Sequence, residues 1–302
     1  MKRLMLTLLA LGLCGGTLFA DTSHSKKTFL SPRAVGVNKA MEYTTWNNHI
    51  YTKWESEPTN IKSHIQVTPF YQASTDQDDI GRYFGIGNGS NTFKVGGEDA
   101  VIAKTADIRV AYLIDGGGSG NATVTFEPEQ EVFGVRLDYF QCINRPIKGL
   151  FFKASTVVAH VQNDVNLKVT DEKKTNLSLK SGALFGMADF FAGKVKVAAG
   201  DADGNTDIQN PLTHAKIDGS QSETGIADID LALGYKWLHD QKKYAYIHAG
   251  VTIPTGNKVR GEYLFEPLYG NGRHFGLGAG LDAGVEVWKG SKGKIRLDGS
   301  LN

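Results

Sequence analysis

A strict alternation of apolar and polar side chains is the feature that most constrains how this chain can fold. From Ala227 to Trp237 the odd positions are apolar or aromatic, whereas most even positions are small or charged. The same pattern runs from Phe275 to Val287 and begins again at Lys294. Successive residues of a β-strand point to opposite faces, so each segment predicts a strand with one apolar and one polar face.

Shorter alternating segments recur along most of the chain. With the C-terminal region they give 11 candidate strands, of which 64–73, 131–140 and 149–162 are the longest in the first half. The chain holds 36 glycines and 8 prolines, a balance that suits many strands and turns better than a helical bundle. Period-two alternation over segments of about ten residues is typical of transmembrane β-barrels, apolar toward lipid and polar toward the lumen.

The predicted fold is therefore all-β, an antiparallel transmembrane β-barrel over residues 63–302 with about 12 or more strands. Closed bacterial barrels have an even strand number, so 11 visible strands lead us to expect a chain that is incomplete at its C-terminus. Mean hydropathy is −0.25, and beyond the N-terminal leader the sequence contains no apolar run near 20 residues. A helical membrane protein is excluded on that ground.

The N-terminus has the features of an export signal. Lys2 and Arg3 precede an apolar stretch from Leu4 to Leu13, and small residues follow up to Ala20. We predict a secretory signal peptide over residues 1–20. Residues 21–62 are then expected to form a periplasmic arm or a plug in the lumen, with a disordered arm as the alternative.

Long and short connections alternate between the predicted strands. Segments 74–105, 200–224 and 255–274 are long and are expected on the outer side, whereas 238–243 and 289–293 are short and expected on the periplasmic side. The apolar stretch 183–191 breaks the alternation. It predicts a short helix, either at a membrane interface or in a buried core.

The polar faces of the predicted strands carry charges of both signs. A lumen lined with them could hold water and orient small solutes. The predicted lumen-lining residues are Arg136, Asp138, Asp228, Asp230, Lys236, Asp282, Glu286, Lys294, Arg296 and Asp298.

Other chemistries have little support in the sequence. The net charge is +1, so no field of one sign gathers nucleic acid. Histidines such as His274 lack an accompanying nucleophile motif, so we expect no enzyme and no cofactor. The oxygen-rich segment 201–207 lacks the ligand spacing of an EF-hand, and we favour a solvated turn over a metal site. Cys142 is expected to be a small, partly buried side chain.

These features together resemble a Gram-negative outer-membrane β-barrel protein of the porin-like kind. The resemblance rests on the leader, on aromatic residues near strand ends such as Tyr235 and Trp288, and on the alternation of short turns with long loops. Segments Val251–Gly256 and Phe275–Leu281 are similar to strand-and-loop segments of porin-like channels. The resemblance concerns architecture and assigns no functional residue.

Three functions follow from these expectations. The first is a porin-like channel for small solutes in the outer membrane, with outer-membrane lipid and the outer-membrane assembly machinery as partners. The second is a structural or adhesion barrel that acts through its outer loops. The third is a soluble exported β-sandwich that binds a ligand, since its strands would also have one apolar face, turned inward.

Overall fold

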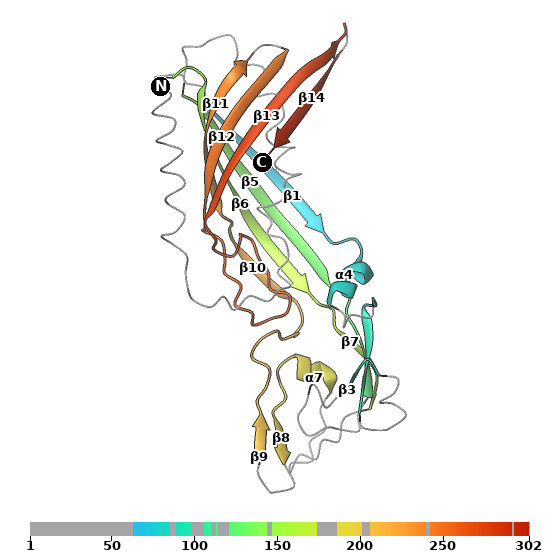
Figure 1. Ribbon diagram of the computed structural model, residues 1–302. Coiled ribbons are helices and arrows are strands. Elements are labelled where there is room, and N and C mark those ends of the chain that lie inside the picture. Colours follow the sequence, from blue (N-terminus) through green and yellow to red (C-terminus); the bar gives the residue numbers. More distant parts are fainter. Residues whose placement is uncertain are drawn as a thin grey trace.

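A computed structural model gives the fold shown in Figure 1. It describes residues 63–84, 89–97, 106–109, 113, 121–143, 147–173, 186–200, 206–239, 242–291 and 293–301. The predicted leader (1–20) and arm (21–62) lie outside the described residues, as do 201–205 of the oxygen-rich segment and the predicted strand 175–181.

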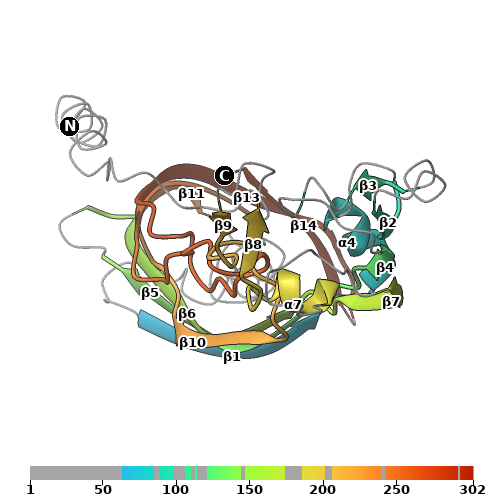
Figure 2. The ribbon, with the colours of Figure 1, turned by 90° about the horizontal axis from the view of Figure 1, so that it is seen from below.

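A large antiparallel sheet dominates the structure. Its path runs β1-β5-β6-β11-β12-β13-β14, and β10 pairs with β6 at one end, which makes eight strands. Viewed from below, the sheet curls into half of a barrel (Figure 2). The strands are β1 (Ser63–Ala73), β5 (Glu129–Cys142), β6 (Leu150–Asp164), β10 (Gln221–Ile226), β11 (Ile229–His239), β12 (Lys243–Ile253), β13 (Gly276–Lys289) and β14 (Lys294–Leu301).

The connections of this sheet differ in length at its two ends. The links β5–β6, β11–β12 and β13–β14 are short and meet at the end of the sheet that is uppermost in Figure 1. The links β1–β5, β6–β11 and β12–β13 are long and meet at the opposite end. Long connections thus gather at one end of the curled sheet and short ones at the other.

The curl turns the apolar side chains outward. Ile65 on β1 is 69% exposed and Phe133 on β5 is 61% exposed, and Leu297 on β14 follows the same rule. On the other face of β5, Arg136 is only 5% exposed. Successive side chains of a strand point to opposite faces of the sheet. The convex surface is therefore apolar, and the concave surface carries the charges.

Glycines on the concave side leave room for aromatic rings. A Cβ on Gly234 of β11 would lie 2.0 Å from the ring of Phe151 on β6. That ring is fully buried, stacks on Phe140 and meets Tyr246 edge-on, so it has little room to retreat. The glycine at position 234 of β11 therefore has a packing cause.

A second, smaller unit of structure lies beyond the long-connection end. Strands β3 (Ile108–Arg109), β2 (Thr92–Gly96), β4 (Asn121–Thr125) and β7 (Lys168–Lys173) form a four-stranded sheet in that order. Only β2 and β3 are parallel. Two helices lie beside it, α4 (Gln77–Phe84) and α7 (Met187–Phe191), with the two-stranded pair β8 (Val197–Gly200) and β9 (Thr206–Gln209) nearby.

The small sheet has its own apolar core. Phe93, Val124 and Phe126 are at most 4% exposed, and Met187 and Phe190 of α7 pack with them. The apolar stretch 183–191 therefore contributes a buried core helix, and the expectation of an interfacial helix is wrong. Among the described helices, α4 and α7 included, none has the length and apolar character needed to cross a membrane.

The structure changes the predicted strand plan in three places. Within the predicted strand 107–114, Ile108–Arg109 form β3 of the small sheet, and the predicted strand 121–126 becomes β4 of the same sheet. The predicted strand 194–199 becomes β8 and pairs with β9. Alternation over a few residues predicts a strand but does not specify which sheet it joins, and β4 buries Ala122 and Val124 in the separate core.

Gly234→Ala should lower the free energy of unfolding by about 1–3 kcal/mol, because a new methyl would overpack the buried ring of Phe151. The matched control is Gly278→Ala on β13, where an added Cβ meets nothing within 4 Å and the change should stay within about 0.5 kcal/mol. Guanidinium unfolding followed by circular dichroism measures both. Equal shifts for the two variants would contradict the packing argument.

Candidate functional site

The concave side of the curled sheet carries a row of aromatic rings from three strands. The Phe140 and Phe151 rings stack at 5.3 Å, Phe151 meets Tyr246 edge-on at 5.4 Å, and Tyr246 stacks on Tyr244 at 5.6 Å. β5, β6 and β12 supply these residues, and β11 between β6 and β12 supplies Gly234. The rings form one continuous surface near the short-connection end.

Two lysines lie over this aromatic surface. Lys236 Nζ is 5.1 Å from the Phe140 ring centroid, and Lys153 Nζ is 5.1 Å from that of Tyr246. Lys236 also donates a weak hydrogen bond to Cys142 Sγ at 3.8 Å. We call the cluster formed by Phe140, Cys142, Phe151, Tyr244 and Tyr246 with Lys153 and Lys236 the inner-wall patch.

Charged pairs adjoin the patch on the same face. Arg136 and Asp138 form an ion pair along β5, with Nη2 to Oδ1 at 2.9 Å. Asp282 Oδ2 on β13 lies 3.9 Å from Lys153 Nζ and 3.3 Å from His248 Nδ1. Strands β6 and β13 are separated by two strands, or about 14 Å along a flat sheet. The contact across them is therefore favoured by the curl.

These charges are buried and paired in this structure. Arg136 and Asp138 are 5% and 4% exposed, and Asp282 is 8% exposed. A buried charge is costly unless it is paired, and each of these has a partner of opposite sign. The concave face thus holds an ordered network of charges and rings.

The long connection 254–274 is folded tightly at the other end of the curled sheet. Asp228, which precedes β11, clamps its two ends: Oδ1 accepts a hydrogen bond from Gly256 N at 3.0 Å and Oδ2 accepts one from Asn271 N at 2.6 Å. Gly256 and Gly270 pass so closely that a Cβ on either would lie about 2.5 Å from the other's Cα. One carboxylate therefore fixes both ends of the loop.

The loop also carries its own internal supports. The Glu266 carboxylate, 9% exposed, accepts hydrogen bonds from the backbone amides of Arg260 at 2.7 Å and Tyr263 at 3.0 Å, and from that of Glu262. Asn257 accepts from Tyr269 N and donates to Pro267 O. Backbone groups that would otherwise lack partners are satisfied within the loop.

Connection 254–274 turns inward instead of extending from the sheet. Its orange-red trace lies within the curve of the sheet in Figure 2. Tyr269 packs against Val132 and Val157 of the concave face, and Asn163 Nδ2 of β6 donates to Glu266 O at 3.0 Å. Phe265 of the same loop joins the core of the small sheet. The expectation that 255–274 lies on the outer side stays a prediction.

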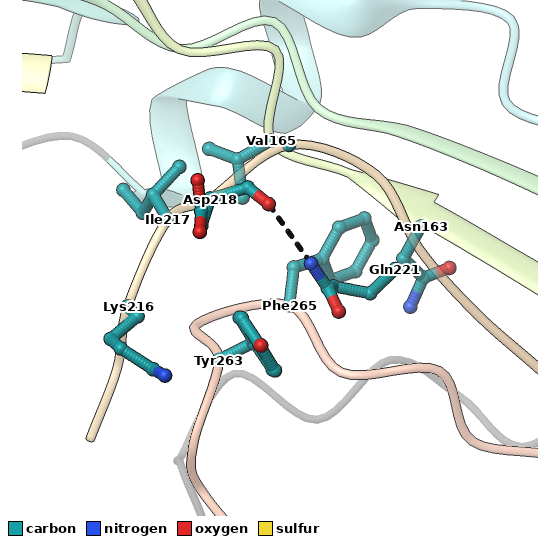
Figure 3. Close-up of a pocket in the computed structure, with 9 residues that line it drawn as sticks. Asn163, Val165, Lys216, Ile217, Asp218, Gln221, Tyr263 and Phe265 are labelled. Carbon is teal, nitrogen blue, oxygen red and sulfur yellow. Dashed lines mark hydrogen bonds between the residues drawn. The ribbon is translucent and has the colours of Figure 1, made fainter. Parts of the chain in front are cut away.

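A shallow pocket lies where this loop meets segment 216–221 (Figure 3). Its empty volume is about 180 Å³, and part of that space is open solvent. Its cation is already engaged: Lys216 Nζ lies 2.8 Å from Glu262 Oε1 and 4.8 Å from the Tyr263 ring centroid. Gln221 Nε2 likewise donates to Asp218 O at 3.0 Å. We assign this pocket no ligand.

The predicted lumen-lining residues lie in different surroundings in the structure. Arg136, Asp138 and Asp282 are buried on the concave face, and Lys236 is half-buried beside them. Asp230 is exposed and accepts from the Thr252 hydroxyl, whereas Asp228 clamps the loop. Glu286 is half-buried on β13, and Arg296 pairs with it in backbone register. Lys294 and Asp298 lie on β14 with Arg296. The backbone of all three residues pairs with β13.

Several residues of the site were not predicted from the sequence. Phe151 is followed by a second phenylalanine, Phe152, so the alternation of β6 does not show which of the two rings faces inward. The inward position of Lys153 is hidden for the same reason. His248 and Tyr246 follow a clean alternation from Lys243, and strict counting from Tyr244 would have placed both on the inner face.

Among the residues that the structure describes, no group of three or more His, Cys, Asp or Glu side chains is arranged to hold a metal ion. The chain was also compared with known proteins. It matches no family model, no curated protein and no solved structure.

Asp228→Asn should loosen the loop 254–274. An amide keeps one acceptor oxygen but cannot accept from both Gly256 N and Asn271 N, and each charge-assisted bond contributes about 1.5–3 kcal/mol. We expect faster amide exchange at Asn271 and faster proteolysis within the loop. Asp230→Asn, which alters one exposed acceptor, is the matched control and should leave the loop protected. Identical protection in both variants would refute the clamp.

The ion pair between Lys216 and Glu262 should make the loop sensitive to acid. The hydrogen bond from Lys216 and its charge lower the pKa of Glu262, and the same bond raises the pKa of Lys216. The Glu262 contribution is therefore present above the unfolded pKa near 4.3 and is lost as pH falls through the lower folded value. Glu262→Gln should remove this part of the pH dependence of loop protection, measured by proteolysis between pH 6 and pH 3. A variant with the parent's full acid response would contradict this assignment.

Proposed function

We propose that the curled sheet is part of the wall of a closed transmembrane β-barrel in an outer membrane, and that the barrel is a porin-like channel for small solutes. One observation carries the proposal: large apolar side chains cover the convex face, while charges and polar groups occupy the concave face. Outer-membrane barrels distribute their side chains in this way.

Strand length also supports a membrane location. A tilted strand of about 9–11 residues crosses the hydrocarbon core of a bilayer. β1, β11 and β12 have 11 residues each, and β5 and β13 have 14 each. These five strands of the curled sheet are thus long enough to span it.

The soluble β-sandwich is less well supported by the arrangement of the two faces. A sandwich buries its apolar faces between two sheets. Here Tyr71, Phe133 and Leu297 are more than 60% exposed on the convex side. An exposed apolar surface of this kind marks a contact with lipid or with another protein.

In the proposed channel, the interior would be shaped at both ends by features of the concave side. The inner-wall patch lies near the short connections, and loop 254–274, clamped by Asp228, lies inside the curve at the opposite end. Mixed charges between them would orient polar solutes. The proposal assigns the protein to the outer membrane, with lipid and the assembly machinery as partners, and it implies export by the predicted leader.

A second candidate function is a structural or adhesion barrel with a filled interior. The pairing and burial of Arg136, Asp138 and Asp282 favour it, since a filled lumen would hold its charges in this way. Planar-bilayer conductance of the refolded protein separates the two candidates. Discrete conductance steps support the channel, and intact barrels without conductance support the structural alternative.

Leu233→Arg tests the lipid-facing assignment. Leu233 on β11 is already 45% exposed, so a soluble protein would tolerate this substitution with little change. In a bilayer, an arginine near the midplane should cost about 2–4 kcal/mol of folding free energy. Tyr83→Arg on α4, 80% exposed and outside the curled sheet, is the control and should be neutral. Folding titrations in lipid vesicles measure both, and equal effects would count against lipid contact.

Cell fractionation tests the proposed location without mutation. The unheated protein should migrate differently from the heated protein on a denaturing gel and should be recovered with outer membranes. Recovery in the soluble periplasm, with no heat-dependent shift, would overturn the barrel proposal.

A further inference from the structure

Three ionisable side chains from three strands meet on the concave side of the curled sheet. The Oδ2 atom of Asp282 on β13 lies 3.3 Å from Nδ1 of His248 on β12 and 3.9 Å from Nζ of Lys153 on β6. All three side chains are at most 14% exposed. One carboxylate oxygen therefore contacts two nitrogen atoms in a largely buried setting.

The register of the sheet brings these side chains together. The residues directly opposite His248 are Gly234 on β11 and Gly280 on β13, and neither has a side chain. Asp282 lies two residues beyond Gly280 on the same face and meets the imidazole diagonally, as side chains in this register can. Lys153 reaches the same carboxylate across β11 and β12. The link between β6 and β13 thus passes the imidazole.

His248 has a limited set of titratable neighbours in the described part of the sheet. On β11 and β13, the strands that pair with β12, alternation places these charged residues on its face: Asp230, Lys236, Asp282 and Glu286. Its own strand adds the phenols Tyr244 and Tyr246. Asp230 is engaged by the Thr252 hydroxyl, and Lys236 lies over the Phe140 ring. A charge on His248 therefore acts first on Asp282 and, through it, on Lys153.

Protonation of His248 would change the balance of charge around Asp282. With a neutral imidazole, the carboxylate has one cation of this cluster beside it, Lys153. A protonated imidazole would be a second cation, closer to the same oxygen, and a charge-assisted hydrogen bond normally shortens such a contact to about 2.7–2.9 Å. The two cations would repel each other. Lys153 could then stay over the Tyr246 ring, whose centroid is 5.1 Å from Nζ.

We propose that His248 is a proton-sensitive switch on the concave face. Its protonation draws Asp282 toward β12 and weakens the link from Lys153 to Asp282 that joins β6 to β13. Histidine is the side chain that ordinarily changes charge between pH 5 and pH 8, so acidification over this range operates the switch. The switch is a contact within one chain and does not depend on the channel. Its consequence for a channel, one more positive charge on the inner wall in acid, rests on the proposed function.

The contribution of Lys153 to stability, measured at two pH values, tests the switch. Lys153→Met keeps most of the apolar stem and removes the charge. This substitution should lower the urea midpoint of unfolding at pH 8. At pH 5 the loss should be about half as large or smaller, because the link is already weakened. Urea titrations of the full chain, followed by circular dichroism, measure both, and an equal loss at the two pH values would overturn the proposal.

His248→Gln is the matched control, since it keeps a polar side chain that cannot be protonated in this range. In this background Lys153→Met should cause the same loss at pH 8 and at pH 5. A pH dependence that survives in the His248→Gln background would place the proton elsewhere and reject the role of His248. In an Asp282→Asn background the effect of Lys153→Met should shrink at both pH values, and an unchanged effect would reject the link.

A spectroscopic measurement on the unsubstituted protein guards against variants that misfold. The carboxyl carbon resonance of Asp282, assigned by its loss in Asp282→Asn, should move between pH 8 and pH 5 as the contact with His248 changes. The same resonance should stay in place in His248→Gln. A resonance that does not move in the parent would overturn the proposal.

Ion selectivity separates this inference from the channel proposal. If both hold, the reversal potential should shift toward anion selectivity between pH 8 and pH 5, and His248→Gln should lose the shift. A pH-dependent contribution of Lys153 without any conductance would support the switch and reject the channel. Conductance with a contribution of Lys153 that is equal at both pH values would support the channel and reject the switch.

Discussion

The structure depends on antiparallel pairing in which the long strands of the curled sheet keep one face apolar. Because the side-chain period is two, a slip of one residue between β5 and β6 would move Arg136 to the convex face and Phe133 to the concave face. The register is therefore fixed by both surfaces at once. The ion contact of Asp282 with Lys153 links β13 to β6, which are not neighbours, and it favours the curved form of the sheet.

Packing on the concave side explains why small and large residues alternate between strands. The Phe151 ring occupies the space above Gly234, and Lys153 reaches past β11 and β12 to Asp282. At the opposite end, Tyr269 takes the corresponding space above Gly225. Glycine on one strand thus makes room for a ring from another, and the concave side is filled from both ends by side chains and by the folded loop.

Much of the curled sheet could be predicted from the sequence, because long alternating segments such as β5 and β13 specify both strand and face. The small sheet could not be predicted, since β3 and β4 are short and their alternation does not indicate which strand each pairs with. The inward fold of 254–274 was also beyond prediction: it depends on Asp228 accepting from Gly256 and Asn271, a contact between residues 28 and 43 positions apart. For the site, Arg136, Asp138 and Asp282 follow from alternation, whereas Phe151 and Lys153 were hidden by two adjacent phenylalanines.

The central claim is that the convex face lies in lipid, and Trp237 offers a direct measurement. The other tryptophans, at positions 46, 54 and 288, would be replaced by phenylalanine, which leaves one indole, 56% exposed on the convex side. After reconstitution into vesicles that contain brominated lipids, the account predicts strong quenching of Trp237 fluorescence by bromine and weak quenching by aqueous iodide. Strong iodide quenching with no effect of bromine would contradict it.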